Sequence, residues 1–359
     1  MARSVPAVAT ESLDADFRDG PFTRNRPLTR NTESGFAERF KNHLEVWAGD
    51  LEHFRNDGDH PWVLNRSVSA LNYFGGKEWE ALLSGKLHKW GHALNSSQAF
   101  AVNLFGPAHS SPDVAKSLWN ALPAAQGHPY PERVVVHFEY SGPDEDFAKT
   151  ELGEAGISTQ IDVAVEGIFS GDIRHMQFIE VKLSESEFGS CRGAKRGKKA
   201  PNPAPDRCGD LSRILQSPST QCWLAEIERR QYWKFIGSTT SGLDTKADKN
   251  GGCPWKGGLY QVVRNWALAR AMLDRGIVAS INLAVCVHPG NHAAAHLSTE
   301  VAGAKRVVAA FNAMARQMIV SDCDPRTLIE AQEQGGAPRA WKNYMYRRYL
   351  PPELCNGSS

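Results

Sequence analysis

Residues 161–185 hold two apolar, β-prone runs whose charged residues constrain both the fold and the chemistry of this chain. The first run carries Asp162, and the second carries the triplet Glu180, Val181 and Lys182. Because side chains alternate between the two faces of a strand, Glu180 and Lys182 share one face and Val181 points to the other. The separation of Asp162 from Glu180 suits neighbouring strands of a hairpin, joined by the polar loop GIFSGDIRHM. We therefore expect two carboxylates and one ammonium to converge.

This convergence has two explanations. A pair of carboxylates can hold a hard divalent cation through oxygen ligands, and a neighbouring ammonium can position an attacking water, as phosphodiester hydrolysis requires. The alternative is an ordinary solvated strand face, because an acid and a lysine two residues apart occur by chance on many such faces. The surrounding sequence is needed to choose between the two.

Hydrophobic periodicity predicts an α/β protein. Helices are expected at 34–54, 77–87, 96–107, 113–122, 219–235, 258–274 and 293–318. Strands are expected at 133–140, 158–166, 175–183 and 278–287. Ser34 is the expected cap of the first helix, and Pro107 is expected to stop the third. The middle of the chain thus runs helix, strand, strand, strand, helix, strand, which predicts a central mixed sheet flanked by helices, with further helices added at the N-terminus.

Five segments in this order resemble the PD-(D/E)XK nuclease superfamily, and specifically a bacterial group of restriction endonuclease-like proteins. The segments are SSQAFAVNLFGP (96–107), VVVHFEY (134–140), TQIDVAV (159–165), FIEVKLSE (178–185) and YQVVRNWALAR (260–270). The resemblance covers roughly residues 90–290 and implies a restriction-endonuclease-like α-β-β-β-α-β core. Ile161 precedes Asp162 where the superfamily nominally has a Pro-Asp pair, but the acid itself is present.

The resemblance also implies roles for individual residues. Asp162, Glu180 and the backbone carbonyl of Val181 are implied to bind Mg²⁺, with Mn²⁺ as an alternative ion. Lys182 is implied to position or help deprotonate the water that attacks phosphorus. Gln261, at the start of the helix after the third strand, occupies a place near the active site in several branches of the superfamily. These implied roles predict a metal-dependent deoxyribonuclease.

The sequence suggests three candidate functions. The first is a Mg²⁺-dependent DNA endonuclease that acts in restriction or defence, as the resemblance suggests. The second is a nucleic-acid-binding module of the same fold with weak or lost catalysis, although the intact acid, acid and lysine set favours the first. The third is an unrelated α/β enzyme acting on a small phosphate ester, and the sequence offers no Gly-rich phosphate loop to support it.

Three further polar residues have both a functional and a structural explanation. Glu139, which alternates with His137 in a strand, is a candidate additional metal ligand, or else an exposed edge carboxylate. Gln98, near the start of a helix, is a candidate for hydrogen bonding to water or phosphate, or else it braces a loop. Arg264 is a candidate phosphate contact, or else it belongs to the polar first turn of an apolar helix.

Positive charge is concentrated in one segment, although the whole chain is nearly neutral. The net charge is +1, from 41 basic and 40 acidic residues, so no global field indicates a nucleic-acid partner. An insertion expected at 184–257 contains a basic stretch that we predict to contact nucleic acid. Its predicted contact residues are Arg192, Lys195, Arg196, Lys198 and Lys199.

The same insertion contains four cysteines, Cys191, Cys208, Cys222 and Cys253. Their spacing includes no close pair of the kind found in zinc ribbons. However, they cluster in a Gly-, Pro- and Lys-rich insertion with little apolar core, which would be stabilised by a metal. An iron–sulfur cluster, which some recombination and CRISPR-associated nucleases of the superfamily hold, and Zn²⁺ are the candidate centres. The alternative is four ordinary thiols.

The bulk properties set the remaining expectations. The 359 residues, 41% of them hydrophobic, suffice for a sizeable core. Residues 1–33 are expected to form a flexible or surface-wrapping arm, and 34–359 a single nuclease-like domain. The sequence shows no secretory signal and no long apolar run, so a cytoplasmic protein with DNA and no membrane as its partner is expected. The sequence leaves the oligomeric state open, with a dimer as one alternative.

Overall fold

The computed structural model describes most of the chain. The described residues are 35–49, 56–57, 60–83, 85–125, 130–156, 158–197, 200–237, 242–243, 252–297, 306–316 and 318–355. The expected arm at 1–33, the Ser34 cap, Lys198 and Lys199 lie outside these residues.

A five-stranded mixed sheet forms the centre of the molecule, with strand order β3-β4-β5-β6-β7. The strands are β3 (Arg133–Tyr140), β4 (Ile161–Phe169), β5 (Ile173–Lys182), β6 (Ser280–Val287) and β7 (Val320–Asp322). β3, β4 and β5 are antiparallel neighbours, whereas β6 runs parallel to β5 and β7 runs parallel to β6. Strands β1 (Asn56–Asp57) and β2 (His60–Leu64) form a separate two-stranded ribbon.

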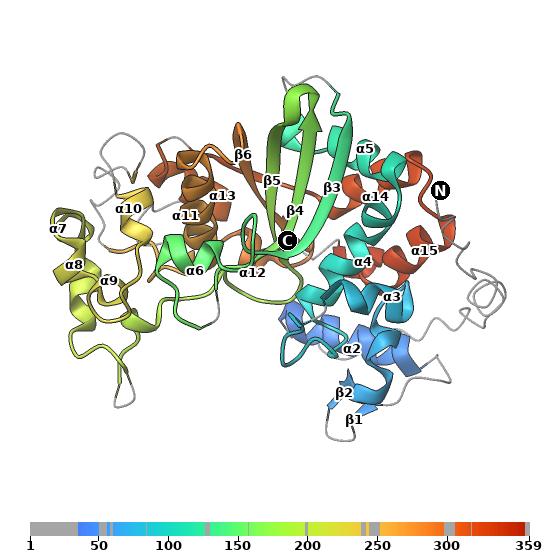
Figure 1. Ribbon diagram of the computed structural model, residues 1–359. Coiled ribbons are helices and arrows are strands. Elements are labelled where there is room, and N and C mark those ends of the chain that lie inside the picture. Colours follow the sequence, from blue (N-terminus) through green and yellow to red (C-terminus); the bar gives the residue numbers. More distant parts are fainter. Residues whose placement is uncertain are drawn as a thin grey trace.

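Helices cover both faces of this sheet, as Figure 1 shows. On one side lie α4 (Ser97–Ser110), α5 (Pro112–Asn120), α14 (Pro325–Gln334) and α15 (Arg339–Arg348). On the other lie α6 (Phe147–Leu152), α11 (Tyr260–Asp274) and α13 (Val307–Met314). The remaining helices outside the β5–α11 insertion are α2 (Phe36–Gly49), α3 (Gly76–Glu80), α12 (His292–Ala295) and α16 (Pro352–Cys355). The predicted α/β class with a mixed sheet between helices is confirmed.

The central strands are apolar on both faces because each face packs on a helical layer. Val163 and Ile179 belong to the hydrophobic core that includes α4. Their neighbours Ala164 and Phe178 point the other way and join the core that includes α11. Polar residues in such strands are therefore conspicuous, and four charged ones, Glu139, Asp162, Glu180 and Lys182, lie toward the same end of the sheet.

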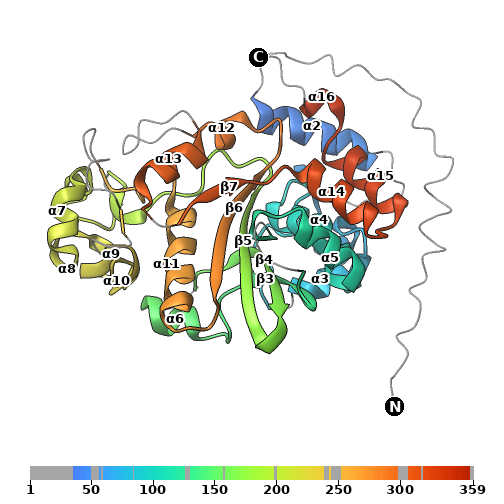
Figure 2. The same cartoon turned by 90° about the horizontal axis from the view of Figure 1, so that it is seen from above.

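The insertion between β5 and α11 contains only short helices among its described residues. These are α7 (Leu211–Gln216), α8 (Pro218–Gln221), α9 (Trp223–Glu226) and α10 (Tyr232–Ile236), together with the 3₁₀ turns Arg192–Ala194 and Pro205–Gly209. They lie beyond α11, on the far side of that helix from the sheet (Figure 2). The single helix expected over 219–235 is wrong. Arg229 adopts a left-handed φ of 59°, which a continuous helix of L-residues excludes.

Two other expectations about elements are wrong. The helix expected over 293–318 is not continuous, because α12 ends at Ala295, the described residues His296, Leu297 and Arg306 are not helical, and α13 begins at Val307. Strand β7 was not expected from the sequence. The hairpin loop expected over GIFSGDIRHM is mostly strand, because the β4–β5 ladder continues to the pair formed by Phe169 and Ile173. The turn itself comprises only Ser170–Asp172.

Pro107 does not stop α4, which continues to Ser110. Proline has no N–H to donate to the carbonyl four residues earlier, which belongs to Asn103. The indole Nε1 of Trp341 in α15 donates to that carbonyl instead, at 2.7 Å. A side chain from a distant helix thus replaces the bond that the proline removes.

No helix in the described ranges is long and apolar enough to cross a lipid bilayer.

Candidate active site

Asp162 and Glu180 face each other across β4 and β5. The ladder between these strands pairs Val163 with Ile179, and in an antiparallel pair the next step along places Asp162 opposite Glu180. The hairpin geometry predicted from the sequence is therefore present, even though the loop is shorter than expected.

Glu139 on β3 lies next to this pair. Its two chain neighbours pair with the two neighbours of Asp162, so the three carboxyl residues stand abreast on adjacent strands. Glu139 itself has a left-handed φ of 48°, a conformation that costs energy for a residue other than glycine and that concentrates at functional sites. Its carboxylate accepts from Nε2 of Gln98 in the first turn of α4, at 2.8 Å. His137 instead bonds to Glu166 at 3.0 Å, so the side chain of Glu139 does not follow the simple alternation that was expected.

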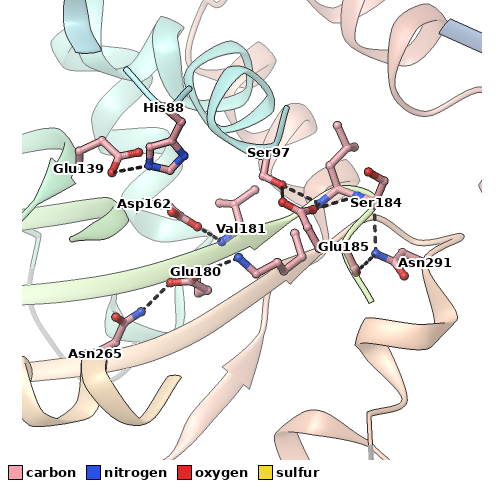
Figure 3. A network of polar contacts seen from close by, with 12 residues as sticks. His88, Ser97, Glu139, Asp162, Glu180, Val181, Ser184, Glu185, Asn265 and Asn291 are labelled. Atoms are coloured by element: carbon pink, nitrogen blue, oxygen red, sulfur yellow. Dashed lines mark hydrogen bonds and ion pairs between the residues drawn. The ribbon is translucent and has the colours of Figure 1, made fainter. Parts of the chain in front are cut away.

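Lys182 and Asn265 hold the two oxygens of Glu180. The Nζ atom of Lys182 donates to Glu180 Oε1 at 2.8 Å, and Nδ2 of Asn265 in α11 donates to Oε2 at 2.7 Å. All three side chains are buried. Figure 3 shows this chain of contacts running from α11 across the end of β5.

The backbone N–H and carbonyl of Val181 face Asp162 on the neighbouring strand. In a parallel pair, successive residues direct their N–H and C=O groups to alternate sides of the strand. The Lys182 carbonyl accepts from His288 N–H on the β6 side, at 2.9 Å. Val181 therefore directs its backbone groups toward β4, and its N–H donates to Asp162 Oδ2 at 2.7 Å. Its carbonyl consequently lies on the side of Asp162.

Crowding and burial perturb these acids. Burial raises the pKa of Asp162 well above its usual value, and the charge of Glu180 raises it further. Burial raises the pKa of Glu139 to about 7, against the hydrogen bond from Gln98, which lowers it. For Lys182, burial lowers the pKa, but the charges of Glu180 and Asp162 outweigh burial and the pKa is raised. The site thus holds acids that repel one another beside Lys182, whose ammonium stays protonated.

Asp162 and Lys182 line a cleft of about 940 Å³, whereas Glu139 and Glu180 are not among its lining residues. The cleft runs between the end of the sheet and the N-terminal elements, and its lining includes Asp162, Lys182, Gln98, Gln261, Glu185, His88, Lys41, Lys89, Trp62 and Trp90. Lys41 Nζ lies 4.7 Å from the ring centroid of Trp62. Lys89 Nζ lies 5.2 Å from the Trp90 ring. The wall opposite the carboxylates is therefore both cationic and aromatic.

Gln261 and Arg264, both expected near the site, have different environments. Gln261 lies in the first turn of α11 and lines the cleft. Arg264 is committed elsewhere, since its guanidinium donates to Thr159 Oγ1 at 3.0 Å and to Glu154 Oε1 at 3.3 Å. We therefore withdraw Arg264 as a phosphate contact.

The basic stretch of the insertion is solvent-exposed where it is described. Arg192, Lys195 and Arg196 are exposed, and Arg196 forms an ion pair with Asp206 at 2.5 Å. None of these three is among the residues that line the cleft described above. Their contact with nucleic acid stays a prediction.

The four cysteines of the insertion are buried and free. Burial raises the pKa of Cys191 to about 12, and it also raises the pKa values of Cys208 and Cys253. Each of these three thiols interacts electrostatically with Cys222. Cysteines that are 62 positions apart in sequence, from first to last, are therefore brought together.

Across the described part of the chain, no three His, Cys, Asp or Glu side chains are already grouped as metal ligands. At the carboxylates, protein donors hold the oxygens: Val181 N–H for Asp162, Lys182 and Asn265 for Glu180, and Gln98 for Glu139. The donor set nevertheless fits a hard cation, because it supplies carboxylate and carbonyl oxygens. A cation would also relieve the repulsion among the acids, once they exchange these partners.

Comparison with known families supports a nuclease lineage. Residues 75–350 match the model of a family described as "Restriction Endonuclease associating with ARP". The chain belongs to this family. The match includes the whole sheet and the cleft-facing acids, and it extends beyond the range of roughly 90–290 expected from the sequence. Comparisons with curated proteins and with solved structures find no significant match.

Several residues of the candidate site were not expected from the sequence. Asn265 follows Gln261 by four positions on one helix, a spacing that places both on the same face and that offered a usable signal. His88 Nε2 lies 3.8 Å from Glu139 Oε2, and Trp90 and Lys89 neighbour it in sequence. They belong to an irregular segment, so no periodicity pointed to them.

Proposed function

We propose that this protein is a Mg²⁺-dependent endonuclease that hydrolyses phosphodiester bonds of DNA. The observation that carries this proposal is the alignment of Glu139, Asp162 and Glu180 on three adjacent strands, with Lys182 beside them and an open cleft in front. The description of the family, which names a restriction endonuclease, supports DNA as the substrate and restriction as the setting.

The ion would be held by Asp162, Glu180 and the Val181 carbonyl, with Glu139 as a further ligand; Mn²⁺ is the alternative ion. When bound, the ion lowers the pKa of a coordinated water and offsets negative charge at phosphorus. The Lys182 ammonium, held beside Glu180, positions the water and neutralises charge on the phosphate.

Two amides orient the acids. Asn265 holds one oxygen of Glu180, and Gln98 holds Glu139 while also donating to the Lys86 carbonyl at 2.9 Å and accepting from His88 N–H at 3.0 Å. Gln98 thereby ties the irregular segment before α4 to the site. Outer partners of this kind fix the direction of a ligand and are costly to remove.

The wall opposite the acids is suited to a nucleic-acid strand. Lys41 and Lys89 supply cations for phosphates, and the rings of Trp62 and Trp90 supply faces on which bases can stack. Trp90 is 52% exposed, so a base can reach its ring. The basic stretch of the insertion, including Arg192 and Lys195, is a second candidate phosphate contact.

The test uses purified full-length protein with supercoiled plasmid, linear duplex and single-stranded DNA, in Mg²⁺, Mn²⁺ or EDTA. Asp162→Asn and Lys182→Ala are expected to lower the cleavage rate by about 100-fold or more, because each removes a group that stabilises charge in the transition state. Glu166→Gln is the matched control, since Glu166 is a partly buried acid on the same strand, bonded to His137 and Arg174.

The possible results separate the proposal from its alternative. Cleavage that survives either substitution would show that the site is elsewhere. A folded wild-type protein that binds DNA but cuts none of the substrates would favour the second candidate, a binding module of the same fold, which the cationic and aromatic cleft wall also suits.

A further inference from the structure

Cys191 and Cys208 converge on one glycine of the insertion. The Sγ atom of Cys191 accepts from the Gly193 N–H at 3.3 Å. The Sγ atom of Cys208 donates to the Gly193 carbonyl at 3.8 Å. Both thiols therefore lie against the backbone of the same glycine, although they come from different turns of the chain.

Cys253 joins them through the backbone. Its N–H donates to the Cys208 carbonyl at 2.9 Å, and the Cys191 N–H donates to the carbonyl of Trp255 at 2.8 Å. The segment around Cys253 thus pairs with the segments of both other cysteines. These three backbone segments lie side by side, although none of them is a β-strand.

Cys222 completes the group. The ring of Trp223, the next residue, fills the space where a Cβ on Gly193 would stand, and a Cβ there would lie 2.8 Å from it. Cys222 is also near enough to interact electrostatically with each of the other three thiols. The exposed fractions of the four cysteines are only 4% to 6%.

The four cysteines belong to a hydrophobic core cluster, so the expectation of little apolar core in the insertion is wrong. Burial alone therefore does not distinguish them from a core thiol such as Cys286, but the irregular backbone around them does. Cys286 lies in a regular strand of the central sheet, where strand pairing and packing account for its burial. The insertion, by contrast, contains no strand among its described residues, and its longest helix there has six residues. A segment with so little regular structure gains most from a crosslinking centre.

We propose that Cys191, Cys208, Cys222 and Cys253 hold a thiophilic metal centre as four thiolates. Each thiol releases its proton to solvent as its sulfur–metal bond forms, and ligation of Zn²⁺ or of an already assembled cluster changes no oxidation state. Two centres share this ligand chemistry: a tetrahedral Zn²⁺ ion and an iron–sulfur cluster. No three His, Cys, Asp or Glu side chains in the described residues are already grouped as ligands, so binding the centre requires the four sulfurs to move closer together.

The centre is independent of the proposed nuclease site. Helices α7 to α10 of the insertion lie beyond α11, on the side away from the sheet (Figure 2), and none of the four cysteines lines the cleft described above. Its role is to fix the insertion, including the exposed basic stretch that begins at Arg192. Nuclease activity and metal content can therefore fail separately.

The experiment purifies the full-length protein without oxygen and without chelators, and measures zinc, iron and acid-labile sulfide per chain. About one zinc per chain with no visible absorbance would identify Zn²⁺, whereas iron with matching sulfide and visible absorbance would identify a cluster. Cys222→Ser is expected to lose the metal, while Cys286→Ala, a buried cysteine outside the group, is expected to keep it. Reaction with a thiol reagent under native conditions should be slow in the wild type and should accelerate when the metal is chelated.

A folded wild-type protein that contains neither metal, and that takes up neither Zn²⁺ nor reconstituted iron and sulfide, would overturn the proposal. So would a Cys222→Ser protein that keeps the full metal content. If Cys222→Ser fails to fold, the wild-type metal content and thiol reactivity still decide. Asp162→Asn is expected to keep the metal, so loss of cleavage there with the metal retained tests the nuclease proposal alone.

Discussion

Asn265 is the residue that fixes the direction of Glu180. Its side chain is 5% exposed, and its Nδ2 atom donates to Glu180 Oε2 at 2.7 Å. An amide donates to a carboxylate without adding a charge, so it orients Glu180 without competing with a cation for that charge. The other oxygen faces Lys182.

Asn265→Ala is expected to weaken Mg²⁺ binding and cleavage by about 10- to 100-fold, because Glu180 loses the partner that holds it in place. Cleavage measured against Mg²⁺ concentration should shift to higher concentrations and recover in part at saturation. Arg270 lies on the same helix and forms a surface ion pair with Asp274. Arg270→Ala should therefore change neither the cleavage rate nor its dependence on Mg²⁺ concentration. An unchanged Mg²⁺ dependence in Asn265→Ala would remove this role from Asn265.

His288 is a buried imidazole with both nitrogens satisfied in its neutral form. Its Nδ1 accepts from the Gly290 N–H at 3.0 Å, and its Nε2 faces the Tyr349 carbonyl. A second proton would place two donors face to face at Nδ1. Burial lowers the pKa of His288 from 6.5 to about 4, and the charges of His43 and Arg326 lower it further against the carbonyl of Tyr349.

Acid should therefore destabilise the fold through His288. Between pH 6.5 and about pH 4 the unfolded chain binds a proton at this residue and the folded chain does not, so stability falls as pH falls, by up to about 3 kcal/mol. Urea unfolding of the wild type and of His288→Asn at pH 7 and pH 5 measures this loss. The wild type should lose more stability than the variant, and the exposed His60→Gln should behave as the wild type. Equal losses in all three would exclude His288 as the cause.

At the scale of elements, α4 depends on α15 for one of its backbone bonds. The Asn103 carbonyl is buried and has no helical donor because residue 107 is proline. Trp341 supplies the donor at 2.7 Å. The continuation of α4 to Ser110 is therefore a tertiary effect.

A double-mutant cycle tests this dependence. Trp341→Phe is expected to cost about 1–3 kcal/mol beyond the change in packing, because it leaves the Asn103 carbonyl buried without a donor. In a Pro107→Ala background the alanine N–H can take over that carbonyl, so the same substitution should cost less. Urea unfolding of the four proteins gives the coupling energy. Additive costs would mean that the indole bond does not substitute for the helical one.

Strands and helices differed in how well the sequence predicted them. The strands around Asp162 and Glu180 were expected because they are apolar and β-prone, and they formed, although both ran further into the turn than expected. The helix expected over 293–318 is wrong, because apolar periodicity does not show where one helix ends and the next begins, and β7 after it was not expected. Pro107 was expected to end a helix, and no local rule could reveal Trp341 as its substitute.

At the scale of the whole molecule, the cleft joins parts of the chain that are distant in sequence. Lys41 comes from α2, Trp62 from β2 and Trp90 from the irregular segment before α4, and all three line the cleft that Asp162 and Lys182 also line. The N-terminal elements, which were expected only as additional helices, thus provide the wall that faces the candidate active site. A strand of nucleic acid in the cleft would contact both.

Trp90→Ala is expected to weaken binding of a single-stranded oligonucleotide by about 5- to 150-fold, the equivalent of one lost base stack. The affinity for duplex DNA should fall less, because the bases of a duplex are already stacked on one another. Binding is measured by fluorescence anisotropy in EDTA, where cleavage is prevented. Tyr130→Ala is the matched control, since Tyr130 is 83% exposed and lies outside the cleft lining. Equal losses for both DNA forms would argue against stacking at Trp90.

The sequence by itself determined the α/β class, the strands that carry Asp162, Glu180 and Lys182, and the pairing of the two acids. These features follow from local rules: side-chain alternation, β propensity and hairpin register. Only the tertiary structure showed that Glu139 leaves the strand pattern, that Arg264 is bound to Glu154, and that Asn265 holds Glu180. It also brought four widely spaced cysteines together. Contacts between segments distant in sequence depend on how the layers pack, and that packing is not encoded in any local pattern.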